Sequence, residues 1–253
     1  MTTSVRYRAT LAYVGTQFHG WQIQRNADRT VQAVVEAALT RFAGAPVRVV
    51  AAGRTDAGVH ADGQVVHFDL PEARGRQAIR EGANTLLPGD VTLLEVVEAR
   101  QSFHARRDAA WKEYVYRWSR AEVIAPRDSP FVAAISRACD PARMADAAEA
   151  LPGTHDFGVF GVRLPAGAAP PTVRTLYGVA IEEVGEQIRA VFRGDGFLRG
   201  MVRSLCGVLA DVGRGKAPPS RIAELLTTGE RRLLAPKAPA KGLTLSRVHY
   251  GAG

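Results

Sequence analysis

Hydrophobic and polar residues alternate along the start of the chain in a pattern that predicts a β-strand followed by a helix. Apolar or aromatic side chains occupy every second position of residues 5–14, as in a half-buried strand. Thr30 is a typical helix N-cap, and apolar residues recur after it at helical spacing up to Phe42. The pattern next predicts strands at 47–52 and 64–69, a helix at 74–86 and a strand at 91–99. The order β-α-β-β-α-β is that of a split-βαβ unit.

The second half predicts a looser copy of this order, although no strict sequence repeat relates the two halves. Its elements are a strand at 111–119, a helix at 141–151, strands at 173–183 and 188–193, helices at 198–213 and 219–227, and a strand at 243–250. We therefore predict an α+β protein with two tandem split-βαβ units, RRM-like or ferredoxin-like, with mainly antiparallel sheets. The predicted domains are 1–108 and 109–253, and their sheets would flank a basic cleft suited to a polyanion.

The charge balance points to an anionic partner. The chain has 253 residues, and its 33 Lys and Arg against 25 Asp and Glu give a formal net charge of +8. A basic protein attracts nucleic acid through counterion release and long-range steering. The lysines are few (Lys112, Lys216, Lys237 and Lys241), and the arginine excess favours forked contacts to phosphate. An alternative source of this excess is genomic base composition, because Ala and Gly are also abundant.

Two other features narrow the class of protein. Cys139 and Cys206 are the two cysteines, and they lack the spacing of paired ligands, which argues against a disulfide scaffold or a zinc site. The N-terminus carries Arg6 and Arg8 inside a strand pattern and has no apolar central region. Neither a signal peptide nor a membrane span is therefore predicted, and we expect a cytosolic protein.

Residues 53–61, Gly-Arg-Thr-Asp-Ala-Gly-Val-His-Ala, are the strongest candidate for chemistry. They connect two predicted strands, and a loop on a rigid sheet is a common place for a catalytic group. Arg54 can keep Asp56 ionised through a charge-assisted hydrogen bond. An ionised, oriented carboxylate acts as a nucleophile or a base. Read alone, the same residues also fit an ordinary turn in which Thr55-Asp56 is a cap and Gly58 supplies a positive φ.

Aromatic residues cluster on the strand predicted at 111–119. Alternation places Tyr114, Tyr116 and Trp118 on one face of that strand. An aromatic strand face is more often part of a core than a stacking platform, so composition alone assigns these residues to packing.

Six segments in order along the chain resemble the TruA family of tRNA pseudouridine synthases. Besides residues 53–61, they are 13–22 with 30–32, 102–106, 112–116, 196–203 and 235–243. Departures from the family pattern fall at Val14, at Thr244 and in the Ala/Gly/Pro-rich stretch Arg163–Pro171. They bear on loop shape and substrate preference rather than on the type of reaction.

The resemblance implies a tRNA pseudouridine synthase that acts at uridines 38, 39 and 40 of the anticodon stem-loop. It implies that Asp56 is the essential carboxylate, either as nucleophile at C1′ or as the base that abstracts the C2′ proton. Arg54 would hold Asp56 and help fill the place of the flipped base, Tyr114 would stack on the uracil, and Arg203 would be a further electrostatic partner. Isomerisation needs no redox step, so no cofactor and no metal are expected. A homodimer is implied as well.

Two other functions fit parts of the sequence. A non-catalytic RNA-binding protein would use the aromatic and basic residues and would not need Asp56. A hydrolase would pair Asp56 with Asp62 or Asp69, because glycosidic cleavage uses two carboxyl groups, and it would release free uracil.

Overall fold

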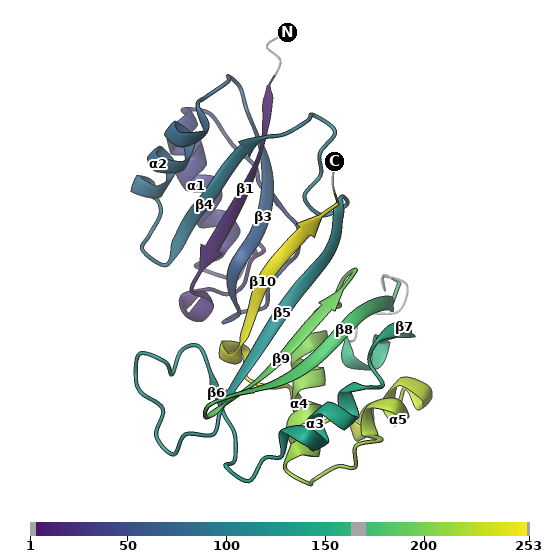
Figure 1. Ribbon diagram of the computed structural model, residues 1–253. Coiled ribbons are helices and arrows are strands. Elements are labelled where there is room, and N and C mark those ends of the chain that lie inside the picture. Colours follow the sequence, from purple (N-terminus) through teal and green to yellow (C-terminus); the bar gives the residue numbers. More distant parts are fainter. Residues whose placement is uncertain (1–3, 163–170, 252–253) are drawn as a thin grey trace. The chain divides into compact units, whose positions relative to one another are not determined.

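The computed structural model describes residues 4–162 and 171–251 (Figure 1). The chain forms two compact units, Met1–Ala110 with Leu245–Gly253 (unit 1) and Trp111–Thr244 (unit 2). The final strand, which the sequence assigned to the second domain, thus lies mainly in unit 1, where it neighbours strand β3. Most of the Ala/Gly/Pro-rich stretch, residues 163–170, lies outside the described residues.

Unit 1 is a sheet with strand order β4-β1-β3-β10, and the short strand β2 pairs with β3. The pairs β1–β3, β1–β4 and β2–β3 are antiparallel. Its elements are β1 (Val5–Tyr13), η1 (Gly15–Gln17), α1 (Val31–Ala43), β2 (Val50–Ala51), β3 (His60–Leu70), α2 (Arg76–Leu86), β4 (Val91–Glu98) and β10 (Leu243–Tyr250).

Helices α1 and α2 pack side by side next to this sheet (Figure 1). The Thr30 hydroxyl accepts a hydrogen bond from the Ala33 amide at 3.4 Å, which confirms the predicted N-cap of α1. Gly82 of α2 lies so close to Phe42 of α1 that a Cβ there would be 2.5 Å from the ring. The apolar face of β1, with Leu11 at its centre, is buried in the core.

The strand predicted at 47–52 is mostly irregular, and only β2 remains of it. The physical reason is that side chains of α1 take the backbone donors that a ladder would use. The Glu36 carboxylate accepts from the Val49 amide at 3.1 Å, and the Thr40 hydroxyl accepts from the Val47 amide at 3.0 Å. An apolar pattern cannot reveal this competition, so the strand was predicted too long.

The strands of unit 2 follow the order β5-β9-β8-β7, and β6 pairs with β5 in parallel. The pairs β5–β9, β8–β9 and β7–β8 are antiparallel. Its elements are β5 (Ala109–Ser119), β6 (Ala133–Ala134), α3 (Pro141–Ala148), β7 (Gly153–Asp156), η2 (Gly158–Phe160), β8 (Val173–Val184), β9 (Gln187–Gly194), α4 (Met201–Gly213), α5 (Arg221–Thr228), η3 (Arg231–Leu233) and η4 (Ala240–Gly242).

Helix α4 supplies much of the core of unit 2. It buries Leu205, Cys206 and Leu209 completely. Tyr116 and Trp118 of β5 are buried as well, which confirms that the aromatic face of this strand is mainly core. Both units are mixed α and β with mainly antiparallel sheets, as predicted, and their description as tandem split-βαβ folds stays a prediction. None of the helices among the described residues is long and apolar enough to cross a membrane.

Candidate active site

The loop that carries Asp56 joins β2 to β3 in unit 1. Asp56 is half-buried at the start of a turn, whereas Arg54 is exposed. The turn is closed by a hydrogen bond from the Val59 amide to the Asp56 carbonyl at 3.1 Å, and Gly58 has a φ of 77° within it. This positive φ was predicted from the sequence, and it lets the chain reverse into β3 directly after the carboxylate.

Two buried side chains hold the N-terminal half of the loop. The Tyr13 hydroxyl lies 2.9 Å from the Thr55 hydroxyl, and Gln64 Nε2 donates to the Gly53 carbonyl at 2.8 Å. Burial raises the pKa of Tyr13 to about 12, so its hydroxyl keeps its proton at neutral pH and can donate. Strands β1 and β3 therefore both fix the loop immediately before Asp56.

The segment after β1 holds the same loop through its backbone. The Trp21 amide donates to the Thr55 carbonyl at 3.1 Å, and the Gly58 amide donates to the Phe18 carbonyl at 3.2 Å. Gly20 lies between these contacts with a φ of 89°, and a Cβ on it would be 2.8 Å from the Thr55 carbonyl oxygen. The backbone around Asp56 is thus anchored on both sides by residues 18–21.

Gly15 and His60 add a third contact at the end of the loop. The Gly15 amide donates to His60 Nδ1 at 3.1 Å, and a Cβ on Gly15 would lie 2.0 Å from the Val59 carbonyl oxygen. His60 is buried, so it is a packing residue that takes a backbone hydrogen bond. Residues 13–22 resemble a family segment in the sequence, but their packing against residues 53–61 was not predicted.

Tyr114 lies on β5 in unit 2, with 7% of its surface exposed. Its ring makes an edge-to-face contact with Phe197, with centroids 5.0 Å apart. Phe197 belongs to the connection from β9 to α4, so the family segments 112–116 and 196–203 meet here.

Arg203 lies in the first turn of α4, also in unit 2. Its Nε donates to the Ala238 carbonyl at 2.9 Å, and the Ala238 amide donates back to the Arg203 carbonyl at 3.0 Å. A Cβ on Gly207 would be 2.1 Å from the Pro236 carbonyl oxygen, so residues 235–243 pass directly over the helix. In the structure, Arg203 therefore holds residues 235–243 against α4.

The predicted site residues therefore fall into two pairs. Asp56 and Arg54 belong to unit 1, and Tyr114 and Arg203 belong to unit 2. The first pair lies where the family segments 13–22 and 53–61 pack together in unit 1. The second pair lies where the segments 112–116, 196–203 and 235–243 meet in unit 2.

Asp69 is far from Asp56 along β3 and has its own partner. The Arg6 guanidinium donates to both Asp69 oxygens at 2.7 Å, and this hydrogen-bonded pair lowers the pKa of the Asp69 carboxyl. Nine residue steps of extended chain separate His60 from Asp69, which is about 30 Å. Glycosidases need their carboxyl groups about 5 to 10 Å apart. This geometry excludes the predicted alternative of an Asp56–Asp69 hydrolase pair.

The family segment 102–106 packs beside β1 and β3 in unit 1. The Ala105 amide donates to His67 Nδ1 at 3.1 Å, and the Arg8 guanidinium lies 6.0 Å from the Phe103 ring centre. Burial, the Arg6 cation and His104 lower the pKa of His67 to about 4, in that order. His67 is thus a neutral acceptor that holds this segment.

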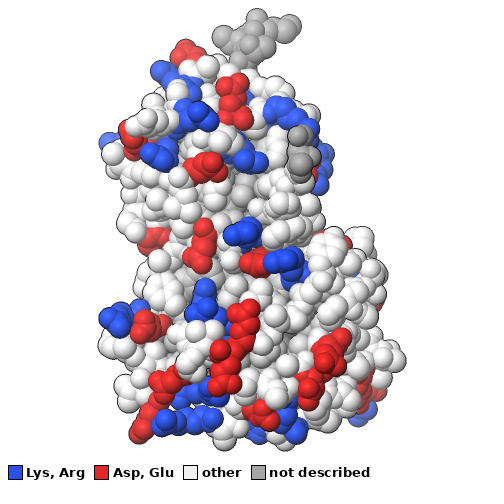
Figure 2. Space-filling model, in the orientation of Figure 1, with Lys and Arg blue, Asp and Glu red and all other residues white. Residues whose placement is uncertain are grey.

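Charge and cavities do not mark another site as clearly. Lys and Arg are intermingled with Asp and Glu over the face drawn in Figure 2, so the net positive charge forms no single-sign patch there.

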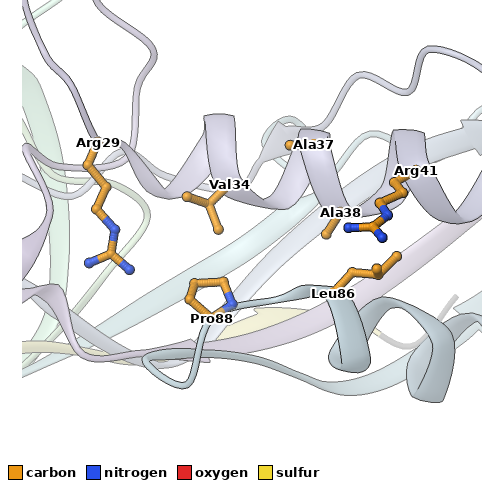
Figure 3. Close-up of a pocket in the computed structure, with 7 residues that line it drawn as sticks. All are labelled: Arg29, Val34, Ala37, Ala38, Arg41, Leu86 and Pro88. Atoms are coloured by element: carbon orange, nitrogen blue, oxygen red, sulfur yellow. The ribbon is translucent and has the colours of Figure 1, made fainter.

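A cavity of about 350 Å³ lies between α1 and the end of α2, and Arg29 and Arg41 are among its lining residues (Figure 3). Arg29 is already bound to both oxygens of Asp90 at 2.8 Å. The cavity contains none of the four predicted site residues. Among the described residues, no cluster of three or more His, Cys, Asp or Glu side chains is arranged to hold a metal ion.

Comparison with known proteins identifies the class of protein. The sequence profile of the family described as tRNA pseudouridine synthase matches residues 9–107 and 147–251. The chain belongs to this family. It is an isomerase that acts on tRNA and converts uridine to pseudouridine.

Relatives named tRNA pseudouridine synthase A match almost the whole chain. One from Solidesulfovibrio magneticus is 44% identical over 98% of this chain and 92% of its own length. One from Myxococcus xanthus is 41% identical over 98% of this chain and 93% of its own length. Among solved structures, the crystal structure of a Cbf5-Nop10-Gar1 complex has a TM-score of 0.33 and 15% identity over 81% of this chain and 45% of that chain.

Proposed function

We propose that this enzyme isomerises uridines 38, 39 and 40 in the anticodon stem-loop of tRNA, with Asp56 as the essential carboxylate. The observation that carries the proposal is the loop at 53–61, whose half-buried Asp56 lies between backbone anchors on both sides. A fold that fixes the backbone on both sides of a carboxylate favours one position for that carboxylate. The similarity of residues 53–61 to the family's active-site loop indicates that the reaction of this carboxylate is the isomerisation of uridine.

The reaction moves one bond of the nucleotide and leaves its atoms in balance. The N1–C1′ bond of uridine breaks, the C1′ carbon bonds to C5 of the same ring, the C5 proton leaves, and N1 gains a proton. Asp56 would act as the nucleophile at C1′ or as the base that removes the C2′ proton. The target uridine must leave its stack, which costs a few kcal/mol that contacts in the pocket offset.

The other predicted residues have roles that follow from their chemistry. Arg54 is exposed, so its guanidinium is available to tRNA as well as to Asp56. Tyr114 would stack on the flipped uracil and help to remove the C5 proton. Arg203 would add a cation toward the substrate in addition to holding the loop at Ala238.

Recognition of tRNA would rest on shape and charge. A-form stems are read mainly through phosphates and 2′-hydroxyls, which suits an enzyme that modifies several neighbouring positions. The net charge of +8 supports binding of a polyanion. We propose a homodimer as the functional state.

Release of tritium from C5-labelled uridine in tRNA tests the proposal. Wild type, Asp56→Asn and the control Asp62→Asn are compared, with tRNA binding measured in parallel; Asp62 is exposed on β3 nearby. We expect release by wild type and Asp62→Asn, no release by Asp56→Asn, and binding by all three. Full activity of Asp56→Asn would refute the catalytic assignment. Binding without release by any protein would indicate an RNA-binding module, and free uracil would indicate a hydrolase.

A further inference from the structure

We infer that Gln64 is a positioning residue of the isomerisation, which acts on Asp56 through the backbone of the active-site loop. The inference rests on the proposed function, because it gives Gln64 a role only if Asp56 performs the chemistry. Gln64 lies on β3, is fully buried, and does not belong to the loop that it holds.

The contacts of Gln64 define what it does. Its Nε2 donates to the Gly53 carbonyl at 2.8 Å and lies 3.5 Å from the Tyr13 hydroxyl. Tyr13 in turn is hydrogen-bonded to Thr55. Gln64 and Tyr13 thus form a buried clamp on Gly53 and Thr55, the positions three and one residues before Asp56.

The orientation of the amide follows from its surroundings. The Gly53 carbonyl is an acceptor, so the group facing it at 2.8 Å must be the NH₂ of Gln64. This leaves Gln64 Oε1 buried without a hydrogen-bond partner among the described atoms. A buried, unsatisfied oxygen is unfavourable for stability, and an apolar side chain of similar volume would avoid it. The Gln64 amide thus faces the loop with its NH₂ group, which contacts the Gly53 carbonyl and the Tyr13 hydroxyl.

Loss of that donor is expected to change catalysis more than folding. The Trp21 and Phe18 anchors would still hold Thr55 and Gly58, so the loop would remain folded. The backbone at Gly53, three residues before Asp56, would lose its partner and gain freedom. A misplacement of about 1 Å at the reacting groups can cost roughly 100-fold in rate. We expect the rate of the chemical step to fall while tRNA affinity stays unchanged.

Two variants at one position separate positioning from packing. Gln64→Met removes the donor and keeps a side chain of similar length. Gln64→Glu presents an O–H donor to the Gly53 carbonyl only while it is protonated, and burial raises the pKa of a carboxyl. Its rate relative to wild type should therefore fall as the pH rises, whereas the ratio for Gln64→Met should not depend on pH. Tyr13 keeps its proton over this range, because its pKa is about 12.

The experiment is single-turnover tritium release at saturating tRNA, with tRNA affinity and thermal unfolding of each protein. Phe68→Leu is the control, because Phe68 is buried on the same strand and stacks on Tyr7, away from the loop. We expect about a 10- to 100-fold slower rate for Gln64→Met, and a lower melting temperature with an unchanged rate for Phe68→Leu.

Each outcome decides between the two claims. A wild-type rate in Gln64→Met, or a loss that only follows the unfolded fraction, overturns the positioning role and leaves the proposed function intact. A Gln64→Glu rate ratio that is flat in pH also counts against it. Absence of release by wild type overturns the proposed function, and the inference with it.

Discussion

Replacing Gly20 with alanine should disturb the loop at 53–61 directly. Gly20 has a φ of 89°, which an L-residue adopts at a cost of about 1–2 kcal/mol. The new Cβ would also be 2.8 Å from the Thr55 carbonyl oxygen and 3.1 Å from the Ala57 amide nitrogen. Both are backbone atoms on either side of Asp56, and relieving such overpacking costs about 1–3 kcal/mol. We expect a total destabilisation of about 2–5 kcal/mol, because the two costs add.

Gly44→Ala is the matched control for this substitution. Gly44 ends α1 with a φ of 69°, and a Cβ on it would meet nothing within 4 Å. It therefore carries the cost of positive φ, about 1–2 kcal/mol, without the contact.

Urea unfolding and single-turnover tritium release would be measured for both glycine variants. Gly20→Ala should lose more stability than Gly44→Ala and should also react more slowly, by up to about 100-fold if the loop moves by 1 Å. Equal losses of stability together with wild-type rates in both variants would refute the reasoning that residues 18–21 fix the position of Asp56.

Three further predictions concern charge. The pKa of His67 is lowered from its ordinary value of 6.5 to about 4 in the folded protein. Between pH 6.5 and pH 4 the unfolded protein therefore binds a proton that the folded protein does not bind, so the stability of wild type should fall as the pH is lowered through this range. His67→Asn should lose less over that range in pH-dependent urea unfolding, and an equal loss would contradict the assignment. The pKa of Asp69 is lowered by Arg6, so this pair stabilises the fold above the ordinary pKa of the carboxyl and the stabilisation is lost as the pH falls through the lowered value. The stability difference between wild type and Asp69→Asn should therefore shrink in acid, and a constant difference would count against the pair. Finally, tRNA affinity measured by filter binding should fall steeply with salt because of the +8 charge, and a flat dependence would argue against phosphate recognition.

Local patterns were sufficient to predict most elements of the fold. The helix that begins after Thr30 was predicted because both its N-cap and its apolar spacing are local features of the sequence. The strand at 47–52 was predicted too long, since its backbone donors bond to Glu36 and Thr40, which are several residues away on a helix. Element type therefore followed from periodicity, whereas the extent of a strand depended on which partners its backbone found.

The residues of the candidate site were proposed from the sequence, whereas the contacts that hold its loop were not. Asp56 was identified from its loop and from family resemblance. The clamp that holds this loop joins Tyr13 to Thr55 and Gln64. Thr55 is 42 positions and Gln64 is 51 positions from Tyr13 in the sequence. No periodicity links such positions, because the contacts depend on the register between β1 and β3.

The structure also changes how the family segments should be weighed. Residues 13–22 and 53–61 are two separate family segments in the sequence. In unit 1 they pack together and are joined by backbone hydrogen bonds. Residues 196–203 and 235–243 likewise pack together in unit 2, where Arg203 is hydrogen-bonded to Ala238. Because the members of each pair hold one another in place, their joint presence also serves the structure. Asp56 and the few groups that orient it are therefore stronger evidence for the proposed chemistry than the number of segments that match.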